Sequence, residues 1–547
     1  MVAEHRERGA APAVDEISRQ APPQERTDAP RPPRTLLPLG HRWGRLDLLW
    51  RVLAAVGAGL VQLLSLPPYG LWWLGPAGAA LLALAVAGAR MRRAAWLGLL
   101  SGASLMVPLV RWQDVFGIDV WLVIAAAEAV YFAPMAMGLA LVVRLPGWPV
   151  WTAALWVVQE AVRARWPMGG FPWGKLAFAQ PDTPFSGYAS LGSSALVTFA
   201  VALVGGLLLW AALRAARSRT ARERAAAALA LACGGAVVAG GALAPSLNNL
   251  EEGEAVAVGM VQGNVPGVGQ MSVAGERMQV LNNHADGVHL LADLVREGEY
   301  PRPDLVLLPE NASDIDPFRD PEAHEIISAA AEDAGVPLLW GMSRYNDDGT
   351  RYVSSVVWDP ETGPGEMYDK RFLVPFGEYV PYRDFFTRFV ARLQQVSSDA
   401  IPGDEPGALD VGGTTLAVAI CFDVAFDEPV RESVAEGGGI VVVPTNNANY
   451  NFTGQSDQQL AITRLRAVEH GRPAVVVSTS GISAVVSPDG TVDYRSPEAE
   501  PDVHVAELTP MEGTTLATRA GAAPEAALSA LGLAAVLVAL RRSRSRV

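Results

Sequence analysis

Apolar residues dominate the first 250 positions of the chain and return near its end, whereas the stretch between has the mixed composition of a globular domain. A bilayer-spanning helix needs roughly 20 consecutive apolar residues. Eight stretches approach that length: approximately residues 48–66, 71–89, 94–110, 120–143, 150–164, 188–213, 225–243 and 522–540. The fifth is short and carries Glu160 and Arg163, which we interpret as an ion pair near the membrane face, either functional or purely structural. The pattern predicts a multi-pass α-helical membrane domain of about eight transmembrane helices.

Between the seventh and eighth apolar stretches, short runs of Val, Ile and Leu alternate with segments of helical periodicity. Such runs are typical of strands covered on both faces, and the alternation indicates an α/β layered domain. The predicted strands are residues 255–261, 304–308, 338–342, 354–358, 415–420, 440–443 and 474–479. The predicted helices are residues 275–297, 321–334, 428–436 and 457–469.

These patterns divide the chain into five parts. Residues 1–46 are rich in Pro, Arg, Glu and Ala, and this composition predicts a disordered tail. Residues 47–245 are predicted to form the membrane domain with seven transmembrane helices, and residues 250–518 the α/β domain. Residues 522–540 are the predicted C-terminal transmembrane helix, and residues 541–547 a basic tail.

The positive charges of this 547-residue chain gather in clusters, although its formal net charge is −14. The clusters are the N-terminal tail, residues 90–93, Arg144, residues 214–224 and residues 541–546. They fall in alternate loops between the apolar stretches, so the positive-inside rule assigns them to the cytoplasm. The α/β domain is therefore predicted to lie on the extracytoplasmic side of the plasma membrane, with both termini in the cytoplasm. Basic residues interleaved with aromatics are missing, so no nucleic-acid partner is expected.

Three polar residues mark a candidate active site, although each has an ordinary structural alternative. Cys421 directly follows the strand 415–420, where a nucleophile is often presented but a buried thiol is commoner. Glu310 ends an apolar strand and is either a general base or simply its first solvated residue. Lys370 lies in a loop rich in aromatics and prolines, where a fixed ammonium could stabilise an oxyanion or be a solvated charge.

In this order, Glu310, Lys370 and Cys421 resemble the Glu-Lys-Cys triad of the carbon–nitrogen hydrolase (nitrilase) superfamily. That resemblance implies an αββα sandwich for the α/β domain. A closer resemblance, over nearly the whole chain after the tail, is to the apolipoprotein N-acyltransferase family of membrane enzymes. The segments that carry it are Lys370–Pro381 (KRFLVPFGEYVP), residues 261–264, 464–473 and 480–484, and the loop residues 170–173 with Glu160 and Gln180.

Three segments depart from the family pattern. Phe422 and Asp423 follow the cysteine where the family often has Tyr-Glu, and residues 446–450 read Asn-Asn-Ala-Asn-Tyr instead of Asn-Asp-Ala-Trp-Phe. The region of residues 269–271 also lacks an expected tryptophan. These changes leave the triad intact.

The resemblance implies a two-step reaction. Glu310 would deprotonate Cys421, and the thiolate would take an acyl chain from a membrane phospholipid while Lys370 holds the oxyanion. The resulting thioester would acylate the α-amino group of the S-diacylglyceryl cysteine of an apolipoprotein. Glu378 is an accessory candidate, or else a loop carboxylate paired with Arg371 or Arg383.

Asp423 and Phe422 are further accessory candidates; Asp423 either orients Lys370 or lines the site, or else is only a loop-capping carboxylate. No metal or other cofactor is expected, because His284 and His289 are five apart instead of four and no phosphate-binding glycine loop occurs.

Two alternative functions stay open: a membrane-anchored amidase or nitrilase that hydrolyses a C–N bond, and a non-enzymatic scaffold or transporter. The oligomeric state is left open.

Overall fold

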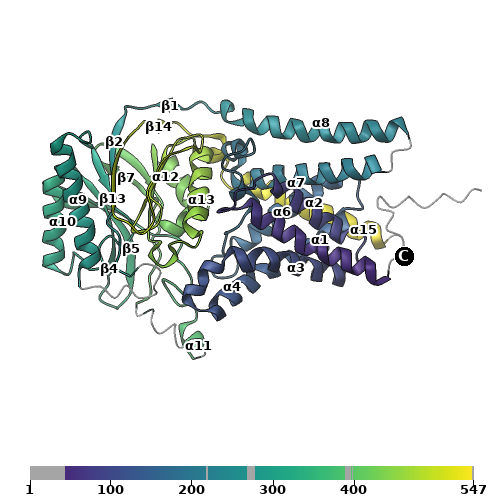
Figure 1. The fold of residues 1–547 in the computed structure, drawn as a ribbon, viewed down its shortest axis with the longest axis horizontal. Helices are drawn as coiled ribbons and strands as arrows, with labels where there is room; N and C mark the ends of the chain where they lie inside the picture. Colours follow the sequence, from purple (N-terminus) through teal and green to yellow (C-terminus); the bar gives the residue numbers. More distant parts are fainter. Residues whose placement is uncertain (1–43, 217–219, 268–276, 389–395, 397, 545–547) are drawn as a thin grey trace, which may run out of the picture. The chain divides into compact units, whose positions relative to one another are not determined.

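The computed structural model describes residues 44–216, 220–267, 277–388, 396 and 398–544, so the predicted disordered tail lies almost entirely outside the described part. Every apolar stretch predicted from the sequence is helical, although the fourth is divided at Tyr131 into two helices. The helices are α1 (Gly44–Ser65), α2 (Leu74–Val86), α3 (Met91–Leu109), α4 (Ile118–Val130), α5 (Phe132–Val142), α6 (Trp148–Arg163), α7 (Ala189–Ala216), α8 (Ala221–Leu243) and α15 (Ala523–Arg544) (Figure 1).

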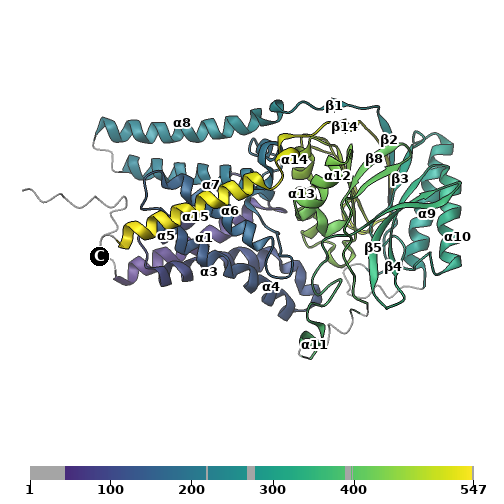
Figure 2. The same ribbon diagram turned by 180° about the vertical axis from the view of Figure 1, so that it is seen from behind.

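Five stretches of the described chain are long and apolar enough to cross a membrane: Asp47–Ser65, Ile118–Val142, Ser186–Ala216, Ala221–Leu247 and Ala523–Ser543. The helices α2, α3 and α6 are not among them, so the total of eight transmembrane helices stays a prediction. The C-terminal helix α15 packs against α6 (Figure 2) and extends to Arg544 instead of ending at residue 540.

Glycines allow neighbouring helices of this part to pack closely. A Cβ atom at Gly98 of α3 would lie 2.2 Å from the carbonyl oxygen of Phe132 in α5. A Cβ atom at Gly205 of α7 would lie 2.2 Å from the carbonyl oxygen of Pro76 in α2. Small residues at such crossings are how helices associate where the hydrophobic effect between them is weak.

In the described part of the α/β region, two six-stranded sheets have the strand orders β13-β2-β3-β4-β5-β6 and β12-β11-β10-β9-β8-β7, and the short strands β1 (Glu251–Glu252) and β14 (Met511–Glu512) form a separate pair. The strands of the first sheet are β13 (Asp502–Leu508), β2 (Val256–Gln262), β3 (Leu305–Leu307), β4 (Leu338–Tyr345), β5 (Arg351–Asp359) and β6 (Gly363–Asp369). Those of the second are β12 (Val492–Arg495), β11 (Ala484–Val486), β10 (Ala474–Ser478), β9 (Ile440–Thr445), β8 (Thr414–Val418) and β7 (Ala408–Val411).

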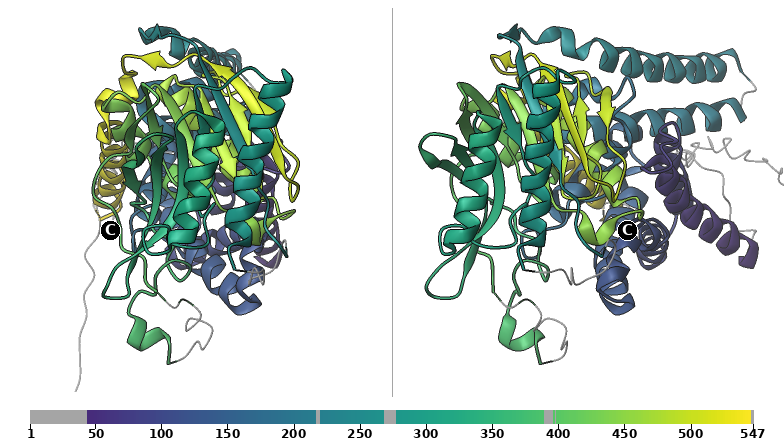
Figure 3. Two further views of the ribbon diagram at one scale, coloured as in Figure 1. Left: turned by 90° about the vertical axis from the view of Figure 1, so that its left-hand side faces the viewer. Right: turned by 60° about the vertical axis from the view of Figure 1, so that its left-hand side comes forward.

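Alternating burial explains the apolar runs of these strands. Leu305 and Leu307 of β3 share one core with Leu416 of β8, so that core lies between the two sheets. Val306 points the other way and packs against α9 (Gln279–Glu297) and α10 (Pro321–Ala334), which cover the first sheet (Figure 3). Helices α12 (Glu428–Ala435) and α13 (Gln455–His470) cover the second sheet, which confirms the predicted αββα sandwich.

Candidate active site

Cys421 begins a sharp turn that follows strand β8. The chain there forms the 3₁₀ helix η6 (Cys421–Ala425), which we call the nucleophile turn. Cys421 has a φ of +51°, a left-handed conformation that is uncommon for residues other than glycine and typical of functional sites. The Glu310 carboxylate and the hydroxyl of Thr445, the last residue of β9, lie beside its thiol and interact with it. Cys421 therefore lies at a strained turn between residues from two strand ends.

Lys370 lies between two carboxylates. Its ammonium donates to Glu310 Oε1 at 2.9 Å and to Glu378 Oε1 at 2.7 Å. Glu310 Oε2 accepts a hydrogen bond from the backbone N–H of Asn446 at 2.9 Å, and Glu378 Oε2 accepts one from Val374 at 2.7 Å. Lys370 is 1% exposed, and Glu310 is 4% exposed. The structure thus brings the three residues of the predicted triad together, with Glu310 and Lys370 buried and Cys421 partly exposed.

Burial governs the protonation states of this site. It raises the pKa of Cys421 to about 12, and the negative charge of Glu310 adds to the effect. It also raises the pKa of Glu310 above its usual value, although Lys370 opposes that shift. Burial alone would lower the pKa of Lys370, but Glu310 and Glu378 outweigh it and hold that pKa well above its usual value. At neutral pH the thiol is therefore protonated, and Glu310 can accept its proton only when ionised.

Glu378 belongs to this buried site. The alternative prediction, in which Glu378 pairs with Arg371 or Arg383, is wrong, because both arginines pair with other carboxylates. The ion pair that Glu378 forms is with Lys370. Glu378 therefore fixes the side of the ammonium that Glu310 does not reach.

Asp423 links the nucleophile turn to the loop that follows Lys370. Its carboxylate accepts hydrogen bonds from the backbone N–H of Ile420 at 3.1 Å, from that of Phe372 at 2.7 Å and from the Tyr368 hydroxyl at 2.8 Å. Burial raises the pKa of Asp423 to about 6, although Lys370 opposes the shift. The carboxylate thus caps the start of the turn and anchors the Lys370 loop to it.

Phe422 joins the site to the helical part through an aromatic cluster. Its ring is stacked on Phe171 and Trp173, with centroids 5.9 and 6.3 Å away. Trp112 packs edge-on against Trp173 at 5.5 Å and against Tyr450 at 5.0 Å. These rings form an apolar wall next to Cys421 that residues of the helical and α/β parts build together.

Sequence analysis missed Trp112 and Gln458 in this region. The indole N–H groups of Trp112 and Trp173 both donate to Gln458 Oε1, at 3.1 and 2.6 Å. No motif surrounds Trp112, and its partner lies in α13, so only the fold reveals the contact. Trp173, in contrast, belongs to the Gly-Phe-Pro-Trp segment that the sequence had marked.

The predicted ion pair between Glu160 and Arg163 is wrong. Arg163 forms its salt bridge with Glu128 at 3.1 Å and extends toward the loop after α6, where it donates to two backbone carbonyls. Glu160 instead accepts hydrogen bonds from the backbone N–H of Leu176 at 2.8 Å and from the Thr198 hydroxyl at 2.7 Å. Both residues therefore fix the loop that carries Phe171 and Trp173.

No group of three or more His, Cys, Asp or Glu side chains in the described parts of the chain is placed to hold a metal ion. His284 is bonded to the carbonyl of Val280 and His289 to Asp333.

Comparison with known proteins agrees with this geometry. Residues 258–517 match the family model for carbon–nitrogen hydrolases, and residues 58–207 match that for the apolipoprotein N-acyltransferase N-terminal domain. The α/β part is thus a carbon–nitrogen hydrolase domain attached to a membrane domain. The chain is 36% identical to the apolipoprotein N-acyltransferase of Mycolicibacterium smegmatis, over 97% of this chain and 93% of that protein. It is 30% identical to that of Chromobacterium violaceum, over 91% and 95%. The chain belongs to the apolipoprotein N-acyltransferase family.

Among solved structures, the nitrilase-superfamily member Nit3 of Saccharomyces cerevisiae matches 47% of this chain and 92% of its own. The TM-score is 0.37 and the sequence identity 18%.

Proposed function

We propose that the protein moves an acyl chain from a membrane phospholipid, through a thioester on Cys421, to the α-amino group of the S-diacylglyceryl cysteine of an apolipoprotein. The observation that carries the proposal is the grouping of the buried Glu310 and Lys370 with the partly exposed Cys421, beside an aromatic wall to which loops of the helical part contribute. Family membership supports a lipoprotein as the acyl acceptor.

The first step forms the thioester. Ionised Glu310 takes the thiol proton as Cys421 attacks the carbonyl carbon of the phospholipid ester. The oxyanion that develops is neutralised by the Lys370 ammonium, which is already in place because two carboxylates hold it. When the tetrahedral intermediate collapses, the carbon–oxygen bond of the ester breaks, and the lysophospholipid oxygen receives the proton from Glu310.

The second step transfers the acyl chain. The free amine of the lipoprotein cysteine attacks the thioester carbonyl and passes its proton to Glu310. The carbon–sulfur bond breaks, Cys421 recovers the proton, and an amide remains. Because water would compete with the amine, transfer requires the thioester to stay dry, and the rings of Phe171, Trp173 and Phe422 provide an apolar surround.

A membrane-bound site suits substrates of this kind. Drawing an acyl chain into water costs about 0.8 kcal/mol per CH₂ group. A site beside apolar helices avoids much of that cost, because the acyl chains of both substrates stay in the membrane.

The proposed topology has the catalytic domain outside the cytoplasm. Helix α3 begins at the basic residues 90–93, where Arg93 pairs with Asp47 at the start of α1 at 3.1 Å. The 3₁₀ segment directly after α3 carries Trp112, which contacts the catalytic domain through Gln458. Helix α7 likewise contacts the catalytic domain near its start, at Ser194, and ends at Ala216 beside a basic segment. In both α3 and α7, the basic residues therefore lie at one end of the helix and the contacts with the catalytic domain lie at the other.

The test is to incubate purified protein with phospholipid and a synthetic S-diacylglyceryl-cysteine peptide and to measure the peptide's mass. A gain of one acyl group, absent in Cys421→Ala, is the expected result. Lysophospholipid and free fatty acid without acylated peptide would instead indicate a hydrolase. No change in lipid or peptide would contradict the proposal.

A further inference from the structure

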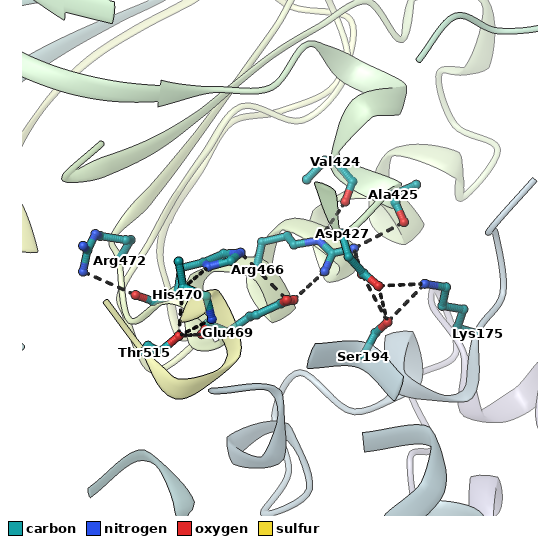
Figure 4. A network of polar contacts seen from close by, with 11 residues as sticks. Lys175, Ser194, Val424, Ala425, Asp427, Arg466, Glu469, His470, Arg472 and Thr515 are labelled. Atoms are coloured by element: carbon teal, nitrogen blue, oxygen red, sulfur yellow. Dashed lines mark hydrogen bonds and ion pairs between the residues drawn. The ribbon is translucent and has the colours of Figure 1, made fainter. Parts of the chain in front are cut away.

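A buried network of charged side chains crosses the contact between the helical part and the catalytic domain (Figure 4). Lys175 and Ser194 come from the helical part, and Asp427, Arg466 and Glu469 come from the catalytic domain. Lys175 is 3% exposed and Arg466 is fully buried. The catalytic steps above use none of these residues, although taking such charges out of water is costly unless their geometry is well satisfied.

On the catalytic side, Arg466 of α13 holds the end of the nucleophile turn. Its guanidinium donates to the carbonyl oxygens of Val424 at 2.9 Å and Ala425 at 3.3 Å, the last two residues of the turn (Figure 4). Asp423 already caps the start of the turn at Ile420. The turn that begins with Cys421 is therefore fixed at both ends by buried charged groups.

On the membrane side, Lys175 reaches the same network through Asp427. Arg466 pairs with Asp427 at 2.6 Å, and the Lys175 ammonium lies 3.7 Å from the same carboxylate. Ser194 completes the link, because it accepts a hydrogen bond from Lys175 at 3.1 Å and donates to Asp427 at 3.2 Å.

The membrane helices in turn hold Lys175 in place. Glu160 of α6 binds the backbone N–H of Leu176, the next residue along the chain, and the Thr198 hydroxyl of α7. Ser194 follows Ser193, whose φ of +59° breaks the regular backbone of α7 at this contact. An unbroken set of contacts thus runs from α6 and α7 to the carbonyl end of the nucleophile turn.

We propose that Lys175 is a positioning residue for Cys421: through Asp427 and Arg466, it makes the geometry of the nucleophile turn depend on the seating of the catalytic domain on the membrane helices. The inference deepens the proposed function and rests on Cys421 being its nucleophile. If the Lys175–Asp427 pair served only to join the two parts, Arg466 would not also need to bind the carbonyl oxygens of the nucleophile turn.

The test compares Lys175→Met, which keeps the volume but removes the charge, with Lys175→Arg and wild type in the full-length protein. Asp182→Asn is the matched control, because Asp182 also pairs with α13 across this contact, through Arg464, but is 64% exposed and does not reach the turn. All variants carry Cys233→Ala, so that iodoacetamide alkylation reports on Cys421 alone. Acyl-transfer kcat and KM, the alkylation rate across a range of pH, and the melting temperature are measured.

We expect Lys175→Met to lower kcat and the pH-independent alkylation rate by about tenfold, with KM little changed, since small misplacements of reacting groups cost that much or more. Lys175→Arg should recover most of the loss, and Asp182→Asn should match wild type. Wild-type rates in Lys175→Met, or equal losses in Lys175→Arg or Asp182→Asn, would overturn the inference.

Misfolding of Lys175→Met and absence of acyl transfer in wild type would each require a different comparison. If Lys175→Met does not fold, Ser194→Ala replaces it, because this substitution keeps every charge. A slower alkylation rate of Cys421 is then expected, and an unchanged rate overturns the inference. If wild type transfers no acyl group, the proposed function fails, but alkylation of Cys421 still tests the positioning role.

Discussion

At the residue scale, the site is built around one lysine shared by two carboxylates. Glu310 and Glu378 each hold the Lys370 ammonium, and each also accepts a backbone N–H. Glu310 is the carboxylate that interacts with Cys421, so in the proposed reaction it receives the thiol proton while Glu378 keeps the ammonium in place. This division predicts different consequences for removing each charge.

Replacing Glu310 with Gln keeps the size of the side chain but removes the base. We expect thioester formation to slow by about 10²- to 10⁴-fold, the usual contribution of a general base, while the melting temperature changes little. Release of lysophospholipid in a single turnover measures the step. Cys421→Ala, which should release none, is the control, and a rate within threefold of wild type would contradict the assigned role.

Replacing Glu378 with Gln should move the pH dependence as well as the rate. The charge of Glu378 contributes to the raised pKa of Glu310. Without that charge, the pKa of Glu310 falls, so ionised Glu310 persists to lower pH and the acidic limb of the kcat profile shifts to lower pH. The plateau should drop about tenfold, because Lys370 loses a charged hydrogen-bond partner.

A pH–rate profile of the Glu378→Gln variant beside wild type makes the comparison. An acidic limb that moved to higher pH, or did not move, would show that Glu378 does not act on Glu310 in this way.

At the element scale, the sequence showed most of the strands that are covered on both faces, but it missed the buried three-residue strand β11. Strands such as β3 and β9 consist almost entirely of buried Val, Ile and Leu, so composition alone identifies them. Strands β6 and β12 were missed because they are largely exposed and carry polar residues. The proximity of Glu310, Lys370 and Cys421 was predictable because these residues follow strands or lie in a distinctive loop. The network of Lys175 and Asp427 was not, since its members have no sequence motif and meet only across the folded contact.

The nucleophile turn is also supported by an aromatic side chain. Phe422 is 6% exposed between rings of the helical part and Phe426. We expect Phe422→Ala to destabilise the protein by about 3 to 5 kcal/mol, as truncation of buried aromatics does, and to reduce acyl transfer because the turn loses its apolar backing.

Thermal unfolding in detergent measures this effect. Phe452→Ala is the control, because Phe452 is 74% exposed and its truncation should hardly change the melting temperature. Equal melting temperatures for both variants would show that the aromatic cluster does not stabilise the contact.

At the scale of the whole molecule, hydropathy predicted the positions of the apolar helices more reliably than the number of them that span the membrane. All eight apolar stretches are helical, but only five stretches of the described chain satisfy both length and composition. Helices such as α6 carry buried charges that bind neighbouring segments, including Arg163 with Glu128. Such helices can be short and less apolar because protein covers much of their surface, and this tertiary effect cannot be read from a local window.

The topology can be tested independently of helix number, by labelling single cysteines in spheroplasts. In a background with Cys233→Ala and Cys421→Ala, Asp347→Cys lies fully exposed on the catalytic domain, and Ser543→Cys lies at the exposed end of α15. A membrane-impermeant maleimide should label Asp347→Cys in intact spheroplasts, but Ser543→Cys only after lysis, because the arginines around Ser543 favour the cytoplasm. Labelling of both positions after lysis is the control for reactivity. The reverse pattern in intact spheroplasts would put the catalytic domain in the cytoplasm, away from acceptors anchored in the outer leaflet.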